Sequence, residues 1–317
     1  MIVGCHLVFV PTPNSAVGFL KGFADVFVGI FGMLAGFLMC RQLAGEDVSC
    51  RQFVSKRVSR LLIPYLAWSV FFVFANCSFD LALHKPLTFN VGSFQEWLRI
   101  MVSGNAGPHT WFLIALFYGQ LILYYPIKLF NRKSWGWVLL MCLGLVSLSI
   151  TVWSSEHAVS WSGLGIYPVR LLAYLAFGAA CGSLFPTVQR YARLFPRSVH
   201  ALWLVWFVVA CVMFQTLNAV NGFWLAAWVS FPIFAWALIG NNSQVDKGGV
   251  IKQVTAVSMG IYCIHPVFTV LFHTILVWVH LTIGDGVILA DWALCWTLAW
   301  GCATIMSRNK YLKRWVT

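Results

Sequence analysis

Long apolar runs separated by short polar breaks dominate the sequence. A helix crosses the roughly 30 Å hydrocarbon core of a bilayer with about 20 apolar residues, and most of the runs approach that length. They cover residues 1–10, 18–40, 61–79, 110–127, 136–153, 167–185, 201–218, 223–240, 254–279 and 287–306. The pattern predicts an all-α, polytopic membrane helix bundle of about ten transmembrane helices, forming one domain over residues 1–317.

Two segments depart from this pattern. Residues 1–10 are apolar, but Pro11 and Pro13 follow and ten residues cannot cross the bilayer as a helix, so we expect a half-helix or a first helix truncated at its N-terminus. The break at 80–109 is long, and its Ser93 and Glu96 have the spacing of a capping box. Apolar residues then recur at helical period, which predicts an interfacial helix on the outer leaflet. These apolar residues are Phe94, Trp97, Leu98, Met101 and Val102.

The composition agrees with a membrane protein. Hydrophobic residues make up 60% of the chain and charged residues 9%, whereas a soluble domain is about a quarter charged. The net charge of +12 does not indicate nucleic-acid binding, because seventeen of the 21 basic residues fall on one side of the predicted topology. The exceptions are Lys21, Lys85, Arg99 and Arg170. The excess of basic residues marks the cytoplasmic side, so both termini are predicted to be cytoplasmic.

The ten cysteines give no sign of a metal site or a disulfide framework. They are scattered, form no C-x-x-C pair, and lie mostly in apolar runs, where cysteine behaves as a small hydrophobic residue.

Ionisable residues inside the apolar runs are the first candidates for function, because they are costly in a membrane. His6 lies in the first run, His265 lies near the middle of the ninth, and Arg170 begins the sixth. His109 precedes Trp111 at the outer end of the fourth run. Each His could instead simply bond a neighbouring helix and pack there.

A basic segment, Lys56 to Arg60, precedes the third run. Residues three apart share a helix face, so Arg57 and Arg60 could hold one anion between two guanidinium groups. The alternative is a cytoplasmic anchor that touches lipid phosphates. Glycines at helical spacing predict close helix packing rather than chemistry. They are Gly29, Gly32 and Gly36 in the second run and Gly178 and Gly182 in the sixth.

Six local patterns, in one order along nearly the whole chain, resemble the acyltransferase-3 family of bacterial membrane acyltransferases. They are the helix ending at His6, Phe31 to Leu38 (FGMLAGFL), Lys56 to Tyr65 (KRVSRLLIPY), His109 to Leu113 (HTWFL), Tyr167 to Gly182, and Gly260 to Pro266 (GIYCIHP). Two features depart from the family pattern. Ala35 stands where the family usually has Ser. The family also carries an Arg ten residues before the His of its first helix, and this Arg has no counterpart because the chain begins five residues before His6.

The resemblance implies transfer of an acyl group, usually acetyl from acetyl-CoA, to a sugar hydroxyl in a surface polysaccharide or lipid-linked glycan. It also implies a bacterial cytoplasmic (inner) membrane protein that uses acetyl-CoA as a substrate and binds no cofactor. A neutral imidazole at His6 suits the catalytic base or nucleophile. Lys56, Arg57 and Arg60 are placed to bind the phosphates of the donor. His109, Trp111, Arg170 and His265 are candidates to line the cavity for the acceptor.

Three alternatives remain at this stage. A multi-pass transporter or flippase of a glycan or small molecule explains the spans and the central histidines but not the ordered motifs. A non-catalytic structural or sensor member of the family is the second. A membrane acyltransferase that acts on lipid or protein is the third.

Overall fold

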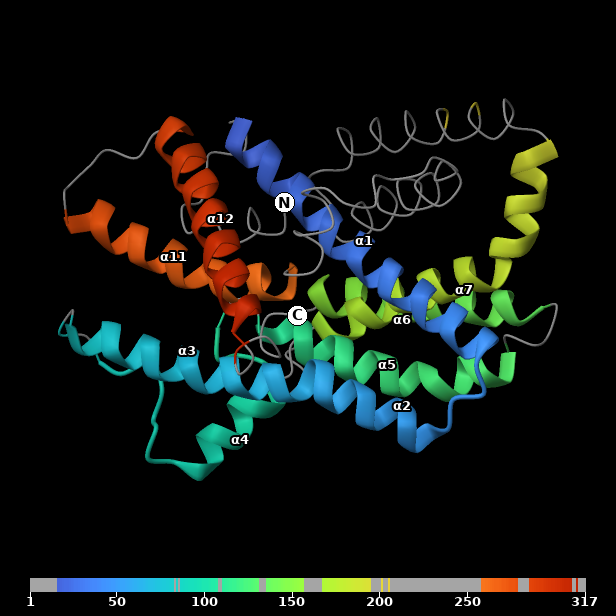
Figure 1. Cartoon of the computed structure of the whole chain (residues 1–317), viewed down its shortest axis with the longest axis horizontal. Coiled ribbons are helices and arrows are strands. Elements are labelled where there is room, and N and C mark those ends of the chain that lie inside the picture. The colour runs from blue at the N-terminus through green and yellow to red at the C-terminus, as the bar shows by residue number, and fades with distance from the viewer. Residues whose placement is uncertain are drawn as a thin grey trace. The chain divides into compact units, whose positions relative to one another are not determined.

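The computed structural model describes residues 16–82, 84, 86–107, 110–130, 135–156, 167–194, 201, 205, 258–278, 285–309 and 312. Within these ranges every regular element is a helix and none is a strand (Figure 1). The elements are α1 (Ala16–Gly45), α2 (Cys50–Arg57), the π-helical turn η2 (Val58–Leu62), α3 (Ile63–Ala82), α4 (Phe94–Ser103), α5 (Thr110–Phe130), α6 (Gly136–Glu156), α7 (Tyr167–Leu194), α11 (Ser258–Trp278) and α12 (Asp285–Arg308).

Four of the described helical stretches are long and apolar enough to cross a membrane. They are Val28–Gly45, Cys50–Ser78, Thr110–Phe130 and Val169–Thr187. This confirms the all-α class for the described residues, while the count of about ten spans stays a prediction. Seven of the ten predicted runs coincide with described helices. The runs at 1–10 and 223–240, and all of the run at 201–218 except residues 201 and 205, lie outside the described residues.

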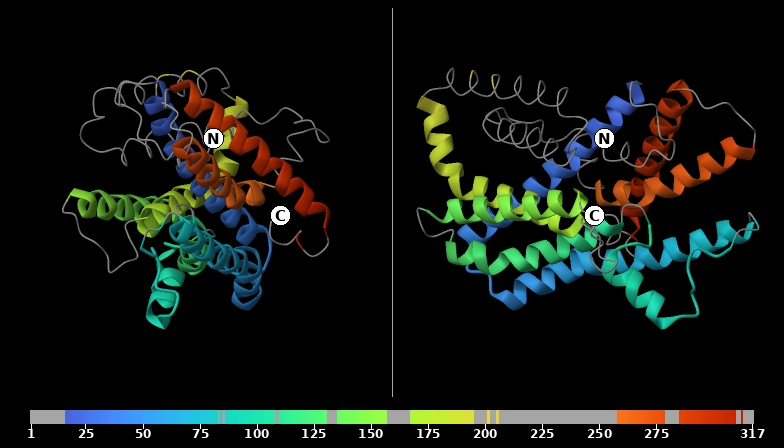
Figure 2. Two further views of the ribbon diagram at one scale, coloured as in Figure 1. Left: turned by 90° about the vertical axis from the view of Figure 1, so that its left-hand side faces the viewer. Right: turned by 180° about the vertical axis from the view of Figure 1, so that it is seen from behind.

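The chain divides into two compact units. One contains Val28–Ser243, and the other contains Met1–Phe27 together with Gln244–Thr317. In the first unit, α5, α6 and α7 lie side by side (Figures 1 and 2). In the second unit, α11 packs on α12.

Glycines allow α1 and α7 to touch through their backbones. A Cβ added to Gly36 would lie 2.9 Å from Cα of Leu175, and one added to Gly178 would lie 2.7 Å from Cα of Met33. Gly32 instead faces a side chain: a Cβ added to it would lie 2.8 Å from Cβ of Tyr174. Small residues let helices approach closely where lipid supplies no hydrophobic force between them. The predicted packing role is confirmed for these glycines.

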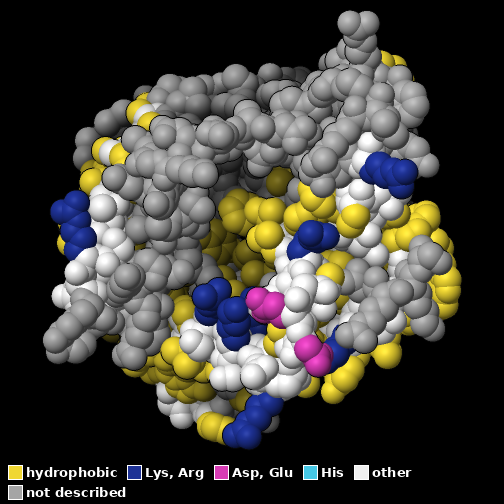
Figure 3. All heavy atoms as spheres, turned by 45° about the vertical axis from the view of Figure 1, so that its right-hand side comes forward, with side chains coloured by type: hydrophobic (Ala, Val, Ile, Leu, Met, Phe, Trp, Pro, Cys, Tyr) yellow, Lys and Arg dark blue, Asp and Glu magenta, His cyan; other side chains and the backbone are white. Residues whose placement is uncertain are grey.

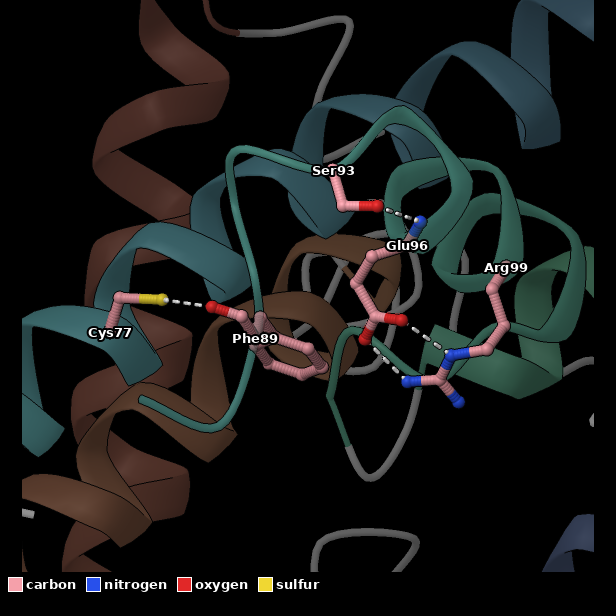
Figure 4. Close-up of polar contacts among 5 residues, drawn as sticks. All are labelled: Cys77, Phe89, Ser93, Glu96 and Arg99. Atoms are coloured by element: carbon pink, nitrogen blue, oxygen red, sulfur yellow. Dashed lines mark hydrogen bonds and ion pairs between the residues drawn. The ribbon is translucent and has the colours of Figure 1, made fainter. Parts of the chain in front are cut away.

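The predicted helix in the 80–109 segment is α4. Its N-cap, Ser93, accepts a hydrogen bond from the Glu96 N–H at 3.4 Å, but the Glu96 carboxylate binds Arg99 at 2.6 and 2.9 Å rather than closing the capping box (Figure 4). This hydrogen-bonded Arg99 lowers the pKa of Glu96. The apolar side chains of Phe94, Leu98 and Val102 are exposed along one face, as an interfacial helix requires, although the outer-leaflet location stays a prediction.

The other face of α4 is held against α3. The Tyr65 hydroxyl, buried in α3, donates to the carbonyls of Ile100 at 3.1 Å and Met101 at 2.7 Å. Trp97 also packs near Phe74, with ring centroids 6.2 Å apart. These contacts fix α4 beside α3 and next to the start of α5.

Candidate functional site

The basic segment lies inside a continuous helical stretch rather than before one. The sequence predicts a span from residue 61, but helical structure begins at Cys50 and continues through α2, η2 and α3. Ser49 starts it with a complete capping box: its hydroxyl accepts from the Gln52 N–H, and its own N–H donates to the Gln52 side chain. Such a cap satisfies backbone donors that a helix start would otherwise leave unpaired.

The turn after Arg57 is π-helical. The Ile63 N–H donates to the Val58 carbonyl, five residues earlier. π-Helical turns are rare and occur frequently at functional sites. Lys56 and Arg60 are exposed, whereas Arg57 is half-buried.

The Arg57 guanidinium is held from two sides. Its Nη2 donates to Oε1 of Gln42 on α1 at 3.3 Å, and its Cζ lies 4.7 Å from the ring centroid of Phe53, one turn earlier on α2. A guanidinium over an aromatic face is attracted by the negative π-cloud. Its Nε is buried and has no hydrogen-bond partner among the described residues. A buried, unpaired cationic donor is costly, so this arrangement suits an acceptor supplied by a ligand.

α5 lies antiparallel to the stretch that carries Arg57. Near its C-terminal end, the ring of Tyr124 packs on Phe53 with centroids 4.8 Å apart, and the Tyr124 hydroxyl donates to the Val48 carbonyl at 2.8 Å. Lys128, one turn later, binds the same carbonyl at 3.3 Å and the Asp47 carboxylate at 3.2 Å. The loop between α1 and α2 is therefore fastened to α5.

On the face drawn in Figure 3, several Lys and Arg side chains lie near Asp or Glu side chains. The Arg41 guanidinium lies 5.6 Å from the ring of Phe185 on α7. The predicted topology puts Arg41, Lys56 and Lys128 on one side, and the contacts bring the loop between α1 and α2 against the C-terminal end of α5. That this end faces the cytoplasm stays a prediction.

Arg57 lies well inside the length of α5. One turn from the Phe53–Tyr124 contact, the antiparallel helices bring Arg57 and Gln120 to the same level. Gln120 precedes the end of α5 at Phe130 by ten residues, or about 15 Å at 1.5 Å per residue. A lipid anchor instead keeps its charge in the headgroup region. The position of Arg57 therefore favours a role inside the bundle.

The other predicted residues of this unit lie on α5 and α7. Arg170 is 6% exposed; its Nε donates to the Tyr174 hydroxyl at 3.2 Å, and its Cζ lies 5.7 Å from the Tyr174 ring. Trp111 is half-buried at the start of α5, with its backbone against Gly104. Gly119, beside Gln120, packs on Leu175, and Arg170 precedes Leu175 by five residues, or about 7.5 Å along α7.

His265 belongs to the other unit and is fully buried in α11. Its Nδ1 lies 3.2 Å from the carbonyl of Ile261, one turn earlier, and its ring lies 6.0 Å from that of Tyr262. A backbone partner of this kind fixes the orientation of an imidazole. His6 and His109 lie outside the described residues.

Residue types outside the predicted set complete the surroundings of Arg57. Gln42, Phe53 and Gln120 were not singled out from the sequence. The sequence signal for the two glutamines is an amide side chain next to apolar residues: Gln120 interrupts the apolar run of α5, and Gln42 follows the apolar run of α1. Among the described residues, no group of three or more His, Cys, Asp or Glu could hold a metal ion.

A family model described as an acyltransferase domain, of the acyltransferase-3 type, matches residues 1–306. The chain belongs to the acyltransferase-3 family. It is therefore an acyltransferase, and with its apolar helices it is a membrane protein. Neither the curated proteins nor the solved structures compared with it gave a match.

Five of the six predicted motifs lie on described helices. The second motif lies on α1, the basic motif runs from α2 into α3, the Trp111 motif opens α5, the Arg170 motif opens α7, and the His265 motif lies on α11. The family establishes the class of reaction; the acyl donor, the acceptor and the roles of individual residues are proposals.

Proposed function

We propose that this acyltransferase moves an acyl group, acetyl in the first instance, from cytoplasmic acyl-CoA to a hydroxyl of a cell-surface or lipid-linked carbohydrate. The chain lies in the bacterial cytoplasmic membrane with both termini in the cytoplasm. Acyl-CoA is consumed as a substrate, and no bound cofactor takes part. The lipid bilayer is the other partner, and nucleic acid is not.

The half-buried Arg57 is the observation that supports the donor site. CoA carries phosphates, and guanidinium groups bind phosphate oxygens with fixed geometry. Arg57 is pre-oriented by Gln42 and Phe53 and has an unpaired buried N–H. Arg60 and Lys56, which are exposed, would add charge to the same anion site.

In the transfer step the acceptor O–H attacks the thioester carbonyl. The new C–O bond forms, the C–S bond breaks, and the proton passes through the imidazole of His6 to the CoA thiolate, which leaves as the thiol. In an alternative two-step mechanism, His6 first takes the acyl group itself and then passes it to the acceptor. His109, Trp111, Arg170 and His265 would line the polar cavity, because polar groups at membrane depth are tolerated only in such a cavity.

The test compares donor use in membranes that contain equal amounts of inserted protein. Arg57→Lys keeps the charge but loses the planar guanidinium that binds two phosphate oxygens at once, so we expect the KM for acetyl-CoA to rise about tenfold or more. Arg60→Lys should act in the same direction. Arg51→Lys, an exposed change at the start of α2, is the matched control and should leave KM unchanged.

If Arg57→Lys and Arg60→Lys both leave the KM for acetyl-CoA unchanged, the segment is a lipid anchor rather than a donor site. Mass spectrometry of surface glycans, with and without the protein, identifies the acceptor by the added mass of one acyl group. Modified lipid or protein in place of glycan would contradict the proposed acceptor class.

A further inference from the structure

Two buried polar atoms of opposite type lie at the same level on facing helices. One is the Arg57 Nε, a hydrogen-bond donor, and the other is the Gln120 Oε1, an acceptor; neither has a partner among the described residues. Gln120 is 4% exposed, so its amide is out of contact with solvent. A buried acceptor without a donor is costly, and native structures seldom leave one unsatisfied.

The two atoms are brought together by one well-defined contact. Phe53 of α2 packs on Tyr124 of α5 with ring centroids 4.8 Å apart. Arg57 follows Phe53 by four residues and Gln120 precedes Tyr124 by four, so each lies one turn away on the same face of its helix. Because the helices are antiparallel, both steps lead in the same direction (Figure 1).

We propose that Gln120 accepts a hydrogen bond from an amide N–H of the acyl donor, at the level where Arg57 binds it. The inference rests on the proposed use of acyl-CoA. The arm that joins the phosphates of CoA to its thioester carries two amide groups, and each amide presents an N–H donor beside a C=O acceptor. That pair matches the free acceptor of Gln120 and the free N–H of Arg57.

The position within the bundle also fits this arm. Gln120 lies about 15 Å from the basic end of α5, a depth reached by a thioester arm whose phosphates stay nearer that end. Gly119, the chain neighbour of Gln120, packs on Leu175, so this level of α5 lies against α7 inside the bundle.

The experiment compares acetyl-CoA with two analogues, in each of which one amide N–H is replaced by an ester oxygen. We expect the wild-type chain to use one analogue about tenfold less efficiently in kcat/KM, as loss of one buried hydrogen bond predicts. In Gln120→Leu this difference should vanish, with acetyl-CoA itself used about tenfold less well. Gln120→Glu, which keeps an acceptor oxygen, should retain the preference for the amide.

The control is Thr151→Val in α6. It removes a buried hydroxyl whose partner is the Ser147 carbonyl in the same helix, at 2.9 Å. We expect the order of kcat/KM among acetyl-CoA and its two analogues to stay the same. The inference would be overturned if the wild-type chain used both ester analogues with the same kcat/KM as acetyl-CoA. It would also be overturned if Gln120→Leu lowered kcat/KM by the same factor for every donor. A wild-type chain inactive with acetyl-CoA would instead contradict the proposed function.

Discussion

The contact between α1 and α7 makes a quantitative prediction for Gly36→Ala. A Cβ at this position would lie 2.7 Å from the carbonyl carbon of Leu175 and 2.9 Å from its Cα. Carbon atoms in contact normally stay about 3.5–4.0 Å apart. The nearest atom, the Leu175 carbonyl oxygen, is closer still, and as part of the backbone it cannot rotate away, so the two helices must separate by at least about 1 Å.

Overpacking of this kind costs about 1–3 kcal/mol, while replacing a helical glycine by alanine contributes about 0.5–1 kcal/mol in the opposite direction. The net effect is a loss between about 0 and 2.5 kcal/mol, centred near 1 kcal/mol. Activity should fall as well, because Gln42, which holds Arg57, follows Gly36 by six residues on α1 and moves with it.

The assay is thermal unfolding of the detergent-solubilised protein, followed by the loss of the monodisperse species. Gly301→Ala is the matched control: this glycine is inside α12, and a Cβ there meets nothing within 4 Å. We expect Gly36→Ala to lower the apparent unfolding temperature by several degrees and Gly301→Ala to leave it unchanged or raise it. Equal stability of the two variants would refute the close approach of α1 to α7.

Three further predictions concern single contacts. Tyr65→Phe removes the bond to the Ile100 carbonyl, so amide hydrogens of α4 should exchange faster while those of α5 do not. Ser49→Ala removes the cap of α2 and should cost about 1 kcal/mol of stability, whereas Ser49→Asp should restore it. A cysteine placed at Lys85 in a cysteine-free chain should react with an impermeant reagent from outside the cell, and labelling from the cytoplasm alone would invert the predicted topology.

The helices and their packing followed from the sequence because both depend on local composition. The apolar runs at 18–40, 110–127 and 167–185 became α1, α5 and α7, since in lipid a chain must satisfy its backbone within the segment. The glycines at 32, 36 and 178 predicted faces for close packing, because small residues permit backbone contact, and the structure shows that these faces of α1 and α7 meet each other.

The surroundings of Arg57 could not be predicted in the same way. The π-helical turn at Val58–Leu62 carries no distinctive residue pattern, so the regular spacing of Arg57 and Arg60 was assumed. The partner of Arg57 is Gln42, fifteen residues away on another helix, and this pairing depends on how α1 lies against α2. Likewise, Glu96 had the spacing of a capping box, but a nearby guanidinium competed successfully for its carboxylate.

Transfer of radiolabelled acetyl groups from acetyl-CoA tests the central claim most directly. Membranes that contain the full chain should move label to carbohydrate, and His6→Gln should abolish the transfer while the amount of inserted protein stays unchanged, because an amide can act neither as base nor as nucleophile. Transfer by His6→Gln at the wild-type rate would contradict the catalytic assignment. Absence of transfer by the unaltered chain would contradict the proposed donor and acceptor together.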